Sequence, residues 1–328
     1  MVGGEKIKRI LKIGIFSVFV LAVAFIAAIA TRPSGGVDID DIFCIVSING
    51  GTYVKNDRVF LKRGDDISIV PVFVIDGEFY SRAGMFTVED TAISSKRPPK
   101  IDFCWYQINP KYKKDGYDNY TNAPKNQFNS YLEPIIYSYT AMEKSGELRL
   151  ADIAVDGFGA YYIQAMPGSA VPENFGNPGA FFMESSALQV IYRSDDSFLG
   201  YLSELMRSPF ILYPKKTVCG HQTDLLIGSD CAEFVIYGFR RLGVDIPYCG
   251  PRNIDQYLIP LSENDVILPG DILHYGSQVA VYYEDKGIIG KIDGDDILLQ
   301  SYGSKPYFTT VDENAKLFGN FRVFRLSD

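Results

Sequence analysis

The sequence contains very little histidine: only His221 and His274 occur among its 328 residues. An imidazole base, if the chain uses one, must therefore be one of these two side chains. Histidine-based metal motifs of the usual spacing are absent as well. We expect no metal ion and no cofactor.

Basic residues are outnumbered, with 32 lysines and arginines against 40 aspartates and glutamates, a formal charge of −8. Several of the basic residues lie within the first 30 positions, at Lys6, Lys8, Arg9 and Lys12, so the remainder is even more acidic than the total. An acidic body of this kind argues against nucleic acid as the main partner.

Charge is missing altogether from "IGIFSVFVLAVAFIAAIA", residues 13–30. As a helix this run is about 27 Å long, close to the thickness of a bilayer core, and it has no polar face. Ala28-Ile29-Ala30 also fits the small-x-small pattern of a cleaved signal. Residues 1–36 are thus a membrane anchor, the reading we favour, or a signal segment with its spacer. In both cases the body lies outside the cytoplasm, in a periplasmic or extracellular space.

The five cysteines are an odd number, so at least one thiol is free even though export permits disulfides. A zinc site from Cys219, His221, Cys231 and Cys249 matches no standard ligand spacing. The acidic turn Asp293–Asp296 is more typical of a solvated hairpin than of a calcium site.

Residues 37–194 are predicted to form a β-rich, sandwich-like domain. Short runs rich in β-branched and aromatic residues alternate with turn signals such as Asn49-Gly50-Gly51. The runs are "DIFCIVSI", "RVFLK", "ISIVPVFVI", "IDFCWYQI", "PIIYSYTA", "AYYIQAM" and "SALQVIY".

Residues 195–328 are predicted to form an α+β domain with two helices and an antiparallel sheet. The first helix has apolar spacing from Phe198 to Met206, with Ser194, Asp195 or Asp196 as its cap. The second lies in "GSDCAEFVIYGFRRLG", with Asp230 as cap and Glu233 completing a capping box. The predicted strands are "GDILHYG", "QVAVYYED", "DILLQSY" and "FRVFRL".

Cys231 falls in the first turn of the second helix. The helix dipole and the unpaired N–H groups there favour an anion, which lowers a thiol pKa and can stabilise an oxyanion. The alternative is a small core residue on an amphipathic helix.

The segment "GSDCAEFVIYGFRRLGVDIP", followed by "LPGDILHYGSQVAVYYED", resembles the NlpC-like cell-wall peptidases, which have a papain-type fold. The resemblance covers roughly residues 205–328. It implies a papain-like domain, Cys231 as nucleophile and peptidoglycan peptides as substrate.

Two family positions are occupied by glutamine. Gln278 stands where the resemblance implies the catalytic histidine, and Gln300 where it implies a third polar residue. A glutamine amide is not a base. These side chains either orient an imidazole or donate to an oxyanion, or they lie on exposed strand faces.

Both histidines are candidates for the base that pairs with Cys231. His221 precedes the helix in a loop, where it could also line a cleft or lie on the surface. His274 lies on a predicted strand, where it could equally be a satisfied core residue.

The sequence therefore predicts an exported, membrane-anchored cysteine peptidase or amidase acting on cell-wall peptides. The alternative is a catalytically impaired papain-fold protein that serves as an envelope binding or scaffolding module. In either case residues 13–30 contact the membrane, and the β-rich domain is a candidate surface for an envelope protein partner.

Overall fold

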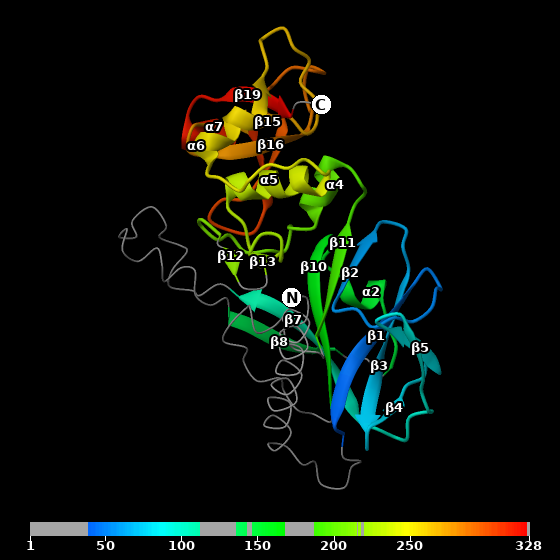
Figure 1. Ribbon diagram of the computed structural model, residues 1–328. Coiled ribbons are helices and arrows are strands. Elements are labelled where there is room, and N and C mark those ends of the chain that lie inside the picture. Colours follow the sequence, from blue (N-terminus) through cyan, green and yellow to red (C-terminus); the bar gives the residue numbers. More distant parts are fainter. Residues whose placement is uncertain are drawn as a thin grey trace, which may run out of the picture.

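The computed structural model describes residues 39–111, 136–142, 146–167, 187–214, 216–217 and 220–326. The predicted anchor or signal segment lies outside these residues. Within them the chain is a mixed α+β protein in which sheets dominate and helices are few and short (Figure 1). Among the helices of the described ranges, none is long and apolar enough to span a membrane.

The first sheet is built around β1 and β3, which pair antiparallel along the whole of β1. Both strands are buried on two faces, because one face meets the second sheet and the other meets the β5–β6 hairpin. Runs of Ile, Val and Phe suit such strands. The strands of this sheet are β1 (Asp41–Ile48), β3 (Ile67–Ile75), β4 (Glu78–Tyr80) and β9 (Leu148–Arg149). The hairpin consists of β5 (Met85–Val88) and β6 (Thr91–Ser94), and the short helix α2 (Leu150–Ile153) follows β9.

The second sheet has the order β2-β11-β10-β7-β8. All its pairs are antiparallel except β2 with β11, which run parallel. One face packs on the first sheet through a core that includes Trp105, Tyr161 and Val190. The strands are β2 (Arg58–Lys62), β7 (Phe103–Lys111), β8 (Ile136–Met142), β10 (Gly159–Pro167) and β11 (Ala187–Arg193).

The C-terminal part contains a six-stranded antiparallel sheet of order β14-β19-β15-β16-β17-β18. The four strands predicted here are confirmed as β15, β16, β17 and β19, whereas β14 and β18 were not foreseen. The bounds are β14 (Leu258–Pro260), β15 (Ile272–His274), β16 (Val279–Glu284), β17 (Ile297–Gln300), β18 (Tyr307–Thr310) and β19 (Arg322–Leu326).

Both predicted helices are present, but the first is shorter than predicted. α4 (Phe198–Ser203) ends before Met206, and its cap is Ser197, whose Oγ accepts from the Gly200 amide at 3.1 Å. The cap proposed among Ser194, Asp195 and Asp196 was therefore wrong, because Asp195 accepts from the Ser197 amide instead. The second helix is α5 (Cys231–Arg241).

Four helical segments of the described residues were not predicted from the sequence: α2 in the N-terminal part, and α6 (Pro251–Ile254), η4 (Asp255–Tyr257) and α7 (Val311–Phe318) in the C-terminal part. α7 carries a full capping box, in which Thr310 and Glu313 bond each other's backbone amides. The capping-box pattern can be recognised in the sequence "TTVDENAKLF", residues 309–318. The run is short, however, and it follows directly on strand-like residues.

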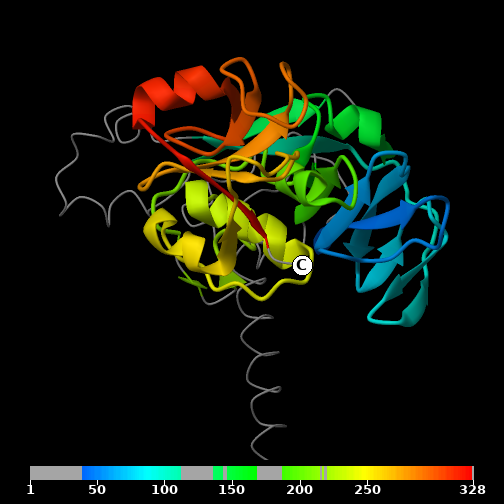
Figure 2. The same ribbon diagram turned by 90° about the horizontal axis from the view of Figure 1, so that it is seen from above.

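α4 and α5 lie between the C-terminal sheet and the N-terminal sheets (Figure 1), and the view from above places β1–β4 to one side of the C-terminal part (Figure 2). One hydrophobic core runs through this junction. It joins Phe234 and Phe239 of α5 to Tyr162 and Ile191 of the second sheet. The N-terminal and C-terminal parts therefore share buried apolar surface.

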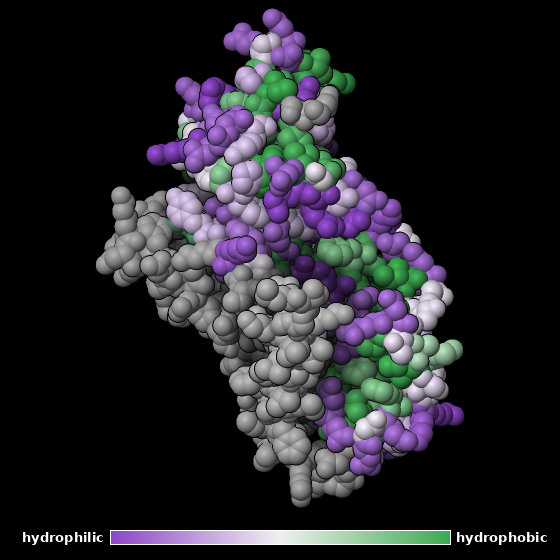
Figure 3. All heavy atoms as spheres, viewed as in Figure 1, coloured by the Kyte–Doolittle hydropathy of each residue, from purple (hydrophilic) through white to green (hydrophobic). Residues whose placement is uncertain are grey.

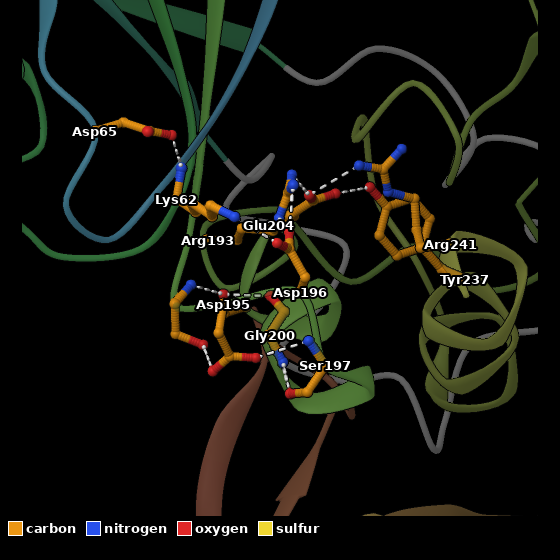
Figure 4. A network of polar contacts seen from close by, with 12 residues as sticks. Lys62, Asp65, Arg193, Asp195, Asp196, Ser197, Gly200, Glu204, Tyr237 and Arg241 are labelled. Atoms are coloured by element: carbon orange, nitrogen blue, oxygen red, sulfur yellow. Dashed lines mark hydrogen bonds and ion pairs between the residues drawn. The ribbon is translucent and has the colours of Figure 1, made fainter. Parts of the chain in front are cut away.

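Polar contacts reinforce the junction. Arg58 of β2 donates to the carbonyl oxygen of Asp224, and Gln189 of β11 donates to that of Leu225, each at 3.3 Å. The carboxylate of Glu204, just after α4, accepts from Arg193 of β11 and from Arg241 of α5 (Figure 4). These bonds link strands before residue 194 to elements after it.

Candidate functional site

Cys231 is the first residue of α5, as predicted. Asp230 is the N-cap, and its Oδ1 accepts from the Glu233 amide at 2.9 Å. The second carboxylate oxygen accepts from the Tyr213 amide at 3.4 Å. The local sequence therefore positions the thiol at the positive end of a well-capped helix.

The surroundings of the Cys231 sulfur disfavour a thiolate, although the helix N-terminus favours one. The residue is 6% exposed and belongs to the apolar core between α5 and the C-terminal sheet. Burial raises the pKa of the thiol, and the adjacent Asp230 carboxylate raises it further. Hydrogen bonds from the backbone amides of Val279 and Ala232 lower the pKa, but by less than burial raises it. At neutral pH the group is a thiol, which is a poor nucleophile.

Gln278 immediately precedes Val279, so its strand passes next to the sulfur. Its side chain is buried, and Nε2 donates to Oε1 of Gln300 at 3.0 Å. Gln300 is buried as well and donates to the Tyr307 hydroxyl at 2.9 Å and to Asn314 Oδ1 at 2.7 Å. The alternative that placed both glutamines on exposed strand faces was therefore wrong. The two amides form one buried network whose outer members come from β18 and α7.

His274 lies on β15, and both of its ring nitrogens have backbone partners. Nδ1 accepts from the Gly276 amide at 3.2 Å, so the proton is on Nε2, which donates to the Pro251 carbonyl oxygen at 2.7 Å. The ring packs edge-on against Phe324. This geometry is that of a satisfied core histidine, the second of the two alternatives for this residue.

His221 lies in β13 (Gly220–His221), which pairs with β12 (Lys216–Thr217). Its ring stacks on Tyr248 with centroids 4.0 Å apart. Nδ1 accepts from the Thr223 amide at 3.4 Å, and the imidazole also hydrogen bonds the Pro214 carbonyl. Burial lowers the pKa of this histidine, so the ring is neutral at pH 7.

The structure thus brings Cys231 close to the strand of Gln278, and Gln278 to Gln300. Within the described part of the chain, neither imidazole makes a hydrogen bond to Cys231. The pairing of Cys231 with His221 or His274 is not observed. The reason is that the backbone at Thr223, Pro214, Gly276 and Pro251 occupies their nitrogens.

Glu233 is a feature that sequence reasoning misread. Its side chain does not return to the Asp230 amide, as a capping box requires, but accepts from the Thr223 hydroxyl at 2.7 Å. His221 Nδ1 lies 3.7 Å from the same carboxylate oxygen. Burial, followed by the charge of Asp230, raises the pKa of Glu233 to about 9. Burial also raises the pKa of Asp230 to about 6.

Cysteine and acidic residues do not assemble a metal centre in the described residues. Cys104, Cys231 and Cys249 are free thiols there, and no group of three candidate ligands gathers. Cys219 of the zinc alternative lies outside the described residues. In the acidic turn, Asp296 accepts from the backbone amides of Lys286 and Asp293, which satisfies the turn internally.

Comparisons of the chain with protein-family models, with curated proteins and with solved structures find no match.

Proposed function

We propose that the chain is an exported, membrane-anchored protein whose papain-like domain has lost its catalytic base and serves as a binding or scaffolding module of the cell envelope. A β-sandwich-like domain precedes it, and residues 13–30 provide the anchor. The NlpC-like motif around Asp230-Cys231 supports a papain-type ancestry of residues 195–328. The acidic composition supports a partner other than nucleic acid.

The buried hydrogen bond between Gln278 and Gln300 carries this proposal. In a papain-type enzyme a base beside the cysteine removes the thiol proton and then protonates the leaving amine. Here an amide occupies that position, and amides neither accept nor release protons near neutral pH. The network through Tyr307 and Asn314 fixes the glutamine pair in place, so it stabilises the fold rather than a reaction intermediate.

An active cysteine peptidase is the competing function. One observation favours it: the Cys231 sulfur lies at the N-terminus of α5 and hydrogen bonds the Val279 amide, an arrangement suited to holding an anion. Burial of the sulfur outweighs this arrangement, because a thiol with a raised pKa is protonated and screened from substrate.

Digestion of purified cell-wall material by the full-length chain distinguishes the two functions. We expect no release of soluble peptides above the level produced by Cys231→Ala. Cys249→Ala is the matched control, because it removes a partly exposed thiol from the same domain. Peptide release by the wild-type chain and by Cys249→Ala, but not by Cys231→Ala, would establish a peptidase and overturn the proposal.

A further inference from the structure

Two loops of the C-terminal part expose apolar side chains. Residues 262–269 precede β15 and residues 285–295 connect β16 to β17. Val266, Leu268 and Ile288 are 60%, 48% and 61% exposed, and Ile289 is 92% exposed. We call these four side chains the tip patch. Soluble proteins rarely expose apolar groups together unless the surface binds something.

The two loops lie against each other. The amide of Ile267 donates to the carbonyl oxygen of Gly290 at 2.9 Å, and the buried Ile267 side chain anchors the first loop in the core. Val266 Cγ1 would lie only 2.8 Å from a Cβ built on Gly290, so the valine covers that glycine. Figure 3 shows apolar atoms bordered by hydrophilic ones at this end of the molecule. The tip patch therefore spans both loops.

Carboxylates and one arginine hold the loops in a defined conformation. Ile288 donates its amide to Asp293 Oδ2 at 2.6 Å, and Leu268 donates to Asp271 Oδ2 at 2.8 Å. Arg325 donates to the Val266 carbonyl oxygen at 2.8 Å. An apolar surface held in place loses little conformational entropy on binding.

Charge around the tip patch is mostly negative. The basic side chains here are Lys286 and Lys291 of the second loop and Arg325 of β19; Lys286 is paired with Glu284 and Arg325 with Asp271. The carboxylates are Glu263, Asp265, Glu284, Asp285, Asp293 and Asp295. This rim repels an anionic lipid surface and also a second copy of itself.

We propose that the tip patch is the docking surface for a partner protein that presents apolar side chains flanked by lysine and arginine. The inference rests on the proposed binding function and names the chemistry of the partner. Apolar contact at Ile288 and Ile289 supplies affinity, and the acidic rim selects a basic partner.

A fluorescent peptide of leucine and lysine serves as the probe, and a peptide of the same length made of leucine and glutamate is its control. Anisotropy with the full-length chain measures affinity. We expect the lysine peptide to bind at least about tenfold more tightly than the glutamate peptide.

Two double variants separate the apolar contact from the charge. Ile288→Ser with Ile289→Ser should weaken binding of the lysine peptide about tenfold. Glu263→Gln with Asp295→Asn should reduce both the affinity and its dependence on salt. Leu317→Ser on α7 is the matched control, being 66% exposed but outside the loops, and should bind as wild type.

Equal affinity for both peptides, or no effect of the isoleucine substitutions, would overturn the proposal. So would self-association, or binding to phosphatidylcholine vesicles, that the double isoleucine variant loses, since a second copy or a lipid surface would then be the occupant. Hydrogen exchange of residues 285–295 on peptide addition reports the site directly. Because Cys231 lies outside both loops, we expect Cys231→Ala to bind the peptide as wild type does, so the result is independent of the digestion experiment.

Discussion

At the scale of single residues, the chemistry of Cys231 depends on two opposed effects. The helix N-terminus stabilises a thiolate by about 1 kcal/mol, or about 2 kcal/mol in a partly buried site. Removal of a charged sulfur from water costs more, and the neighbouring Asp230 adds repulsion. The position of the cysteine in the helix was predictable from Asp230 and the apolar spacing. The burial of its sulfur was not, because it depends on strands about 50 residues further along the chain.

Glu233 provides a prediction about pH. Its pKa is raised to about 9, so the folded chain holds a proton on this carboxyl more tightly than the unfolded chain does. Its contribution to stability is therefore complete below about pH 4 and is lost as the pH rises toward 9. Glu233→Gln keeps an acceptor for Thr223 without the titrating proton. We expect this variant to gain stability over wild type by about 1.4 kcal/mol per pH unit as the pH rises from about 4.5 to 8, several kcal/mol in all, and to be similar to it at pH 4. Urea unfolding at the two pH values measures this, and an advantage that shrank with rising pH would contradict it.

At the scale of elements, the contact between α4 and α5 depends on a glycine in the middle of a helix. Phe198 stacks on Phe239 with ring centroids 4.5 Å apart, over Gly238. A Cβ at Gly238 would lie 2.6 Å from the Phe198 ring and 2.8 Å from Leu202. Glycine lowers the intrinsic helix propensity of α5, but it allows α4 and α5 to approach each other closely.

Gly238→Ala should destabilise the chain by about 1–3 kcal/mol through this overlap. The same substitution at a solvent-exposed glycine within a helix would instead stabilise the protein, by up to about 1 kcal/mol. Gly250→Ala is the control, because its φ is −73° and no atom lies within 4 Å of an added Cβ. Thermal unfolding of both variants tests the packing, and a more stable Gly238→Ala protein would show that α4 is not held against α5.

Glu204 makes a second prediction at this scale. Its carboxylate is fully buried and accepts from Arg193, Arg241 and the Tyr237 hydroxyl (Figure 4). Removing one partner of such a network leaves the other charges without compensation, so Glu204→Gln should cost about 3 kcal/mol. Asp196→Asn is the matched control. Asp196 also pairs with Arg193 but is half exposed, so removing its charge should lower the free energy of unfolding far less. Equal effects of the two substitutions in denaturant melts would contradict a structural role for the buried carboxylate.

At the scale of the whole molecule, the alternation of strand-like runs and turn signals predicted the two sheet-rich parts. It did not predict the order of the strands or the parallel pairing of β2 with β11, because register between distant segments leaves no local trace in the sequence. The continuous core between α5 and the second sheet was equally hidden. In the sequence nothing distinguishes Tyr162 and Ile191 from other strand residues; only the tertiary structure shows that they pack against α5.

This shared core predicts one cooperative unfolding transition for the described part of the chain. Trp105, the single tryptophan of the chain, is buried between the N-terminal sheets, so its fluorescence reports unfolding there. Exposure of Cys231 to a thiol reagent reports unfolding of the C-terminal part. We expect the two midpoints in denaturant to coincide. Two separate midpoints would show that the parts on either side of residue 194 unfold independently.

The rate at which Cys231 reacts with iodoacetamide, followed by mass spectrometry on the full-length chain between about pH 6 and 9, tests the central claim most directly. A buried thiol with a raised pKa reacts only when the protein opens, so Cys231 should be modified far more slowly than the partly exposed Cys249 at every pH. Denaturant should remove the difference. Rapid modification of native Cys231 with a midpoint below about pH 7 would reveal an accessible thiolate and contradict the account.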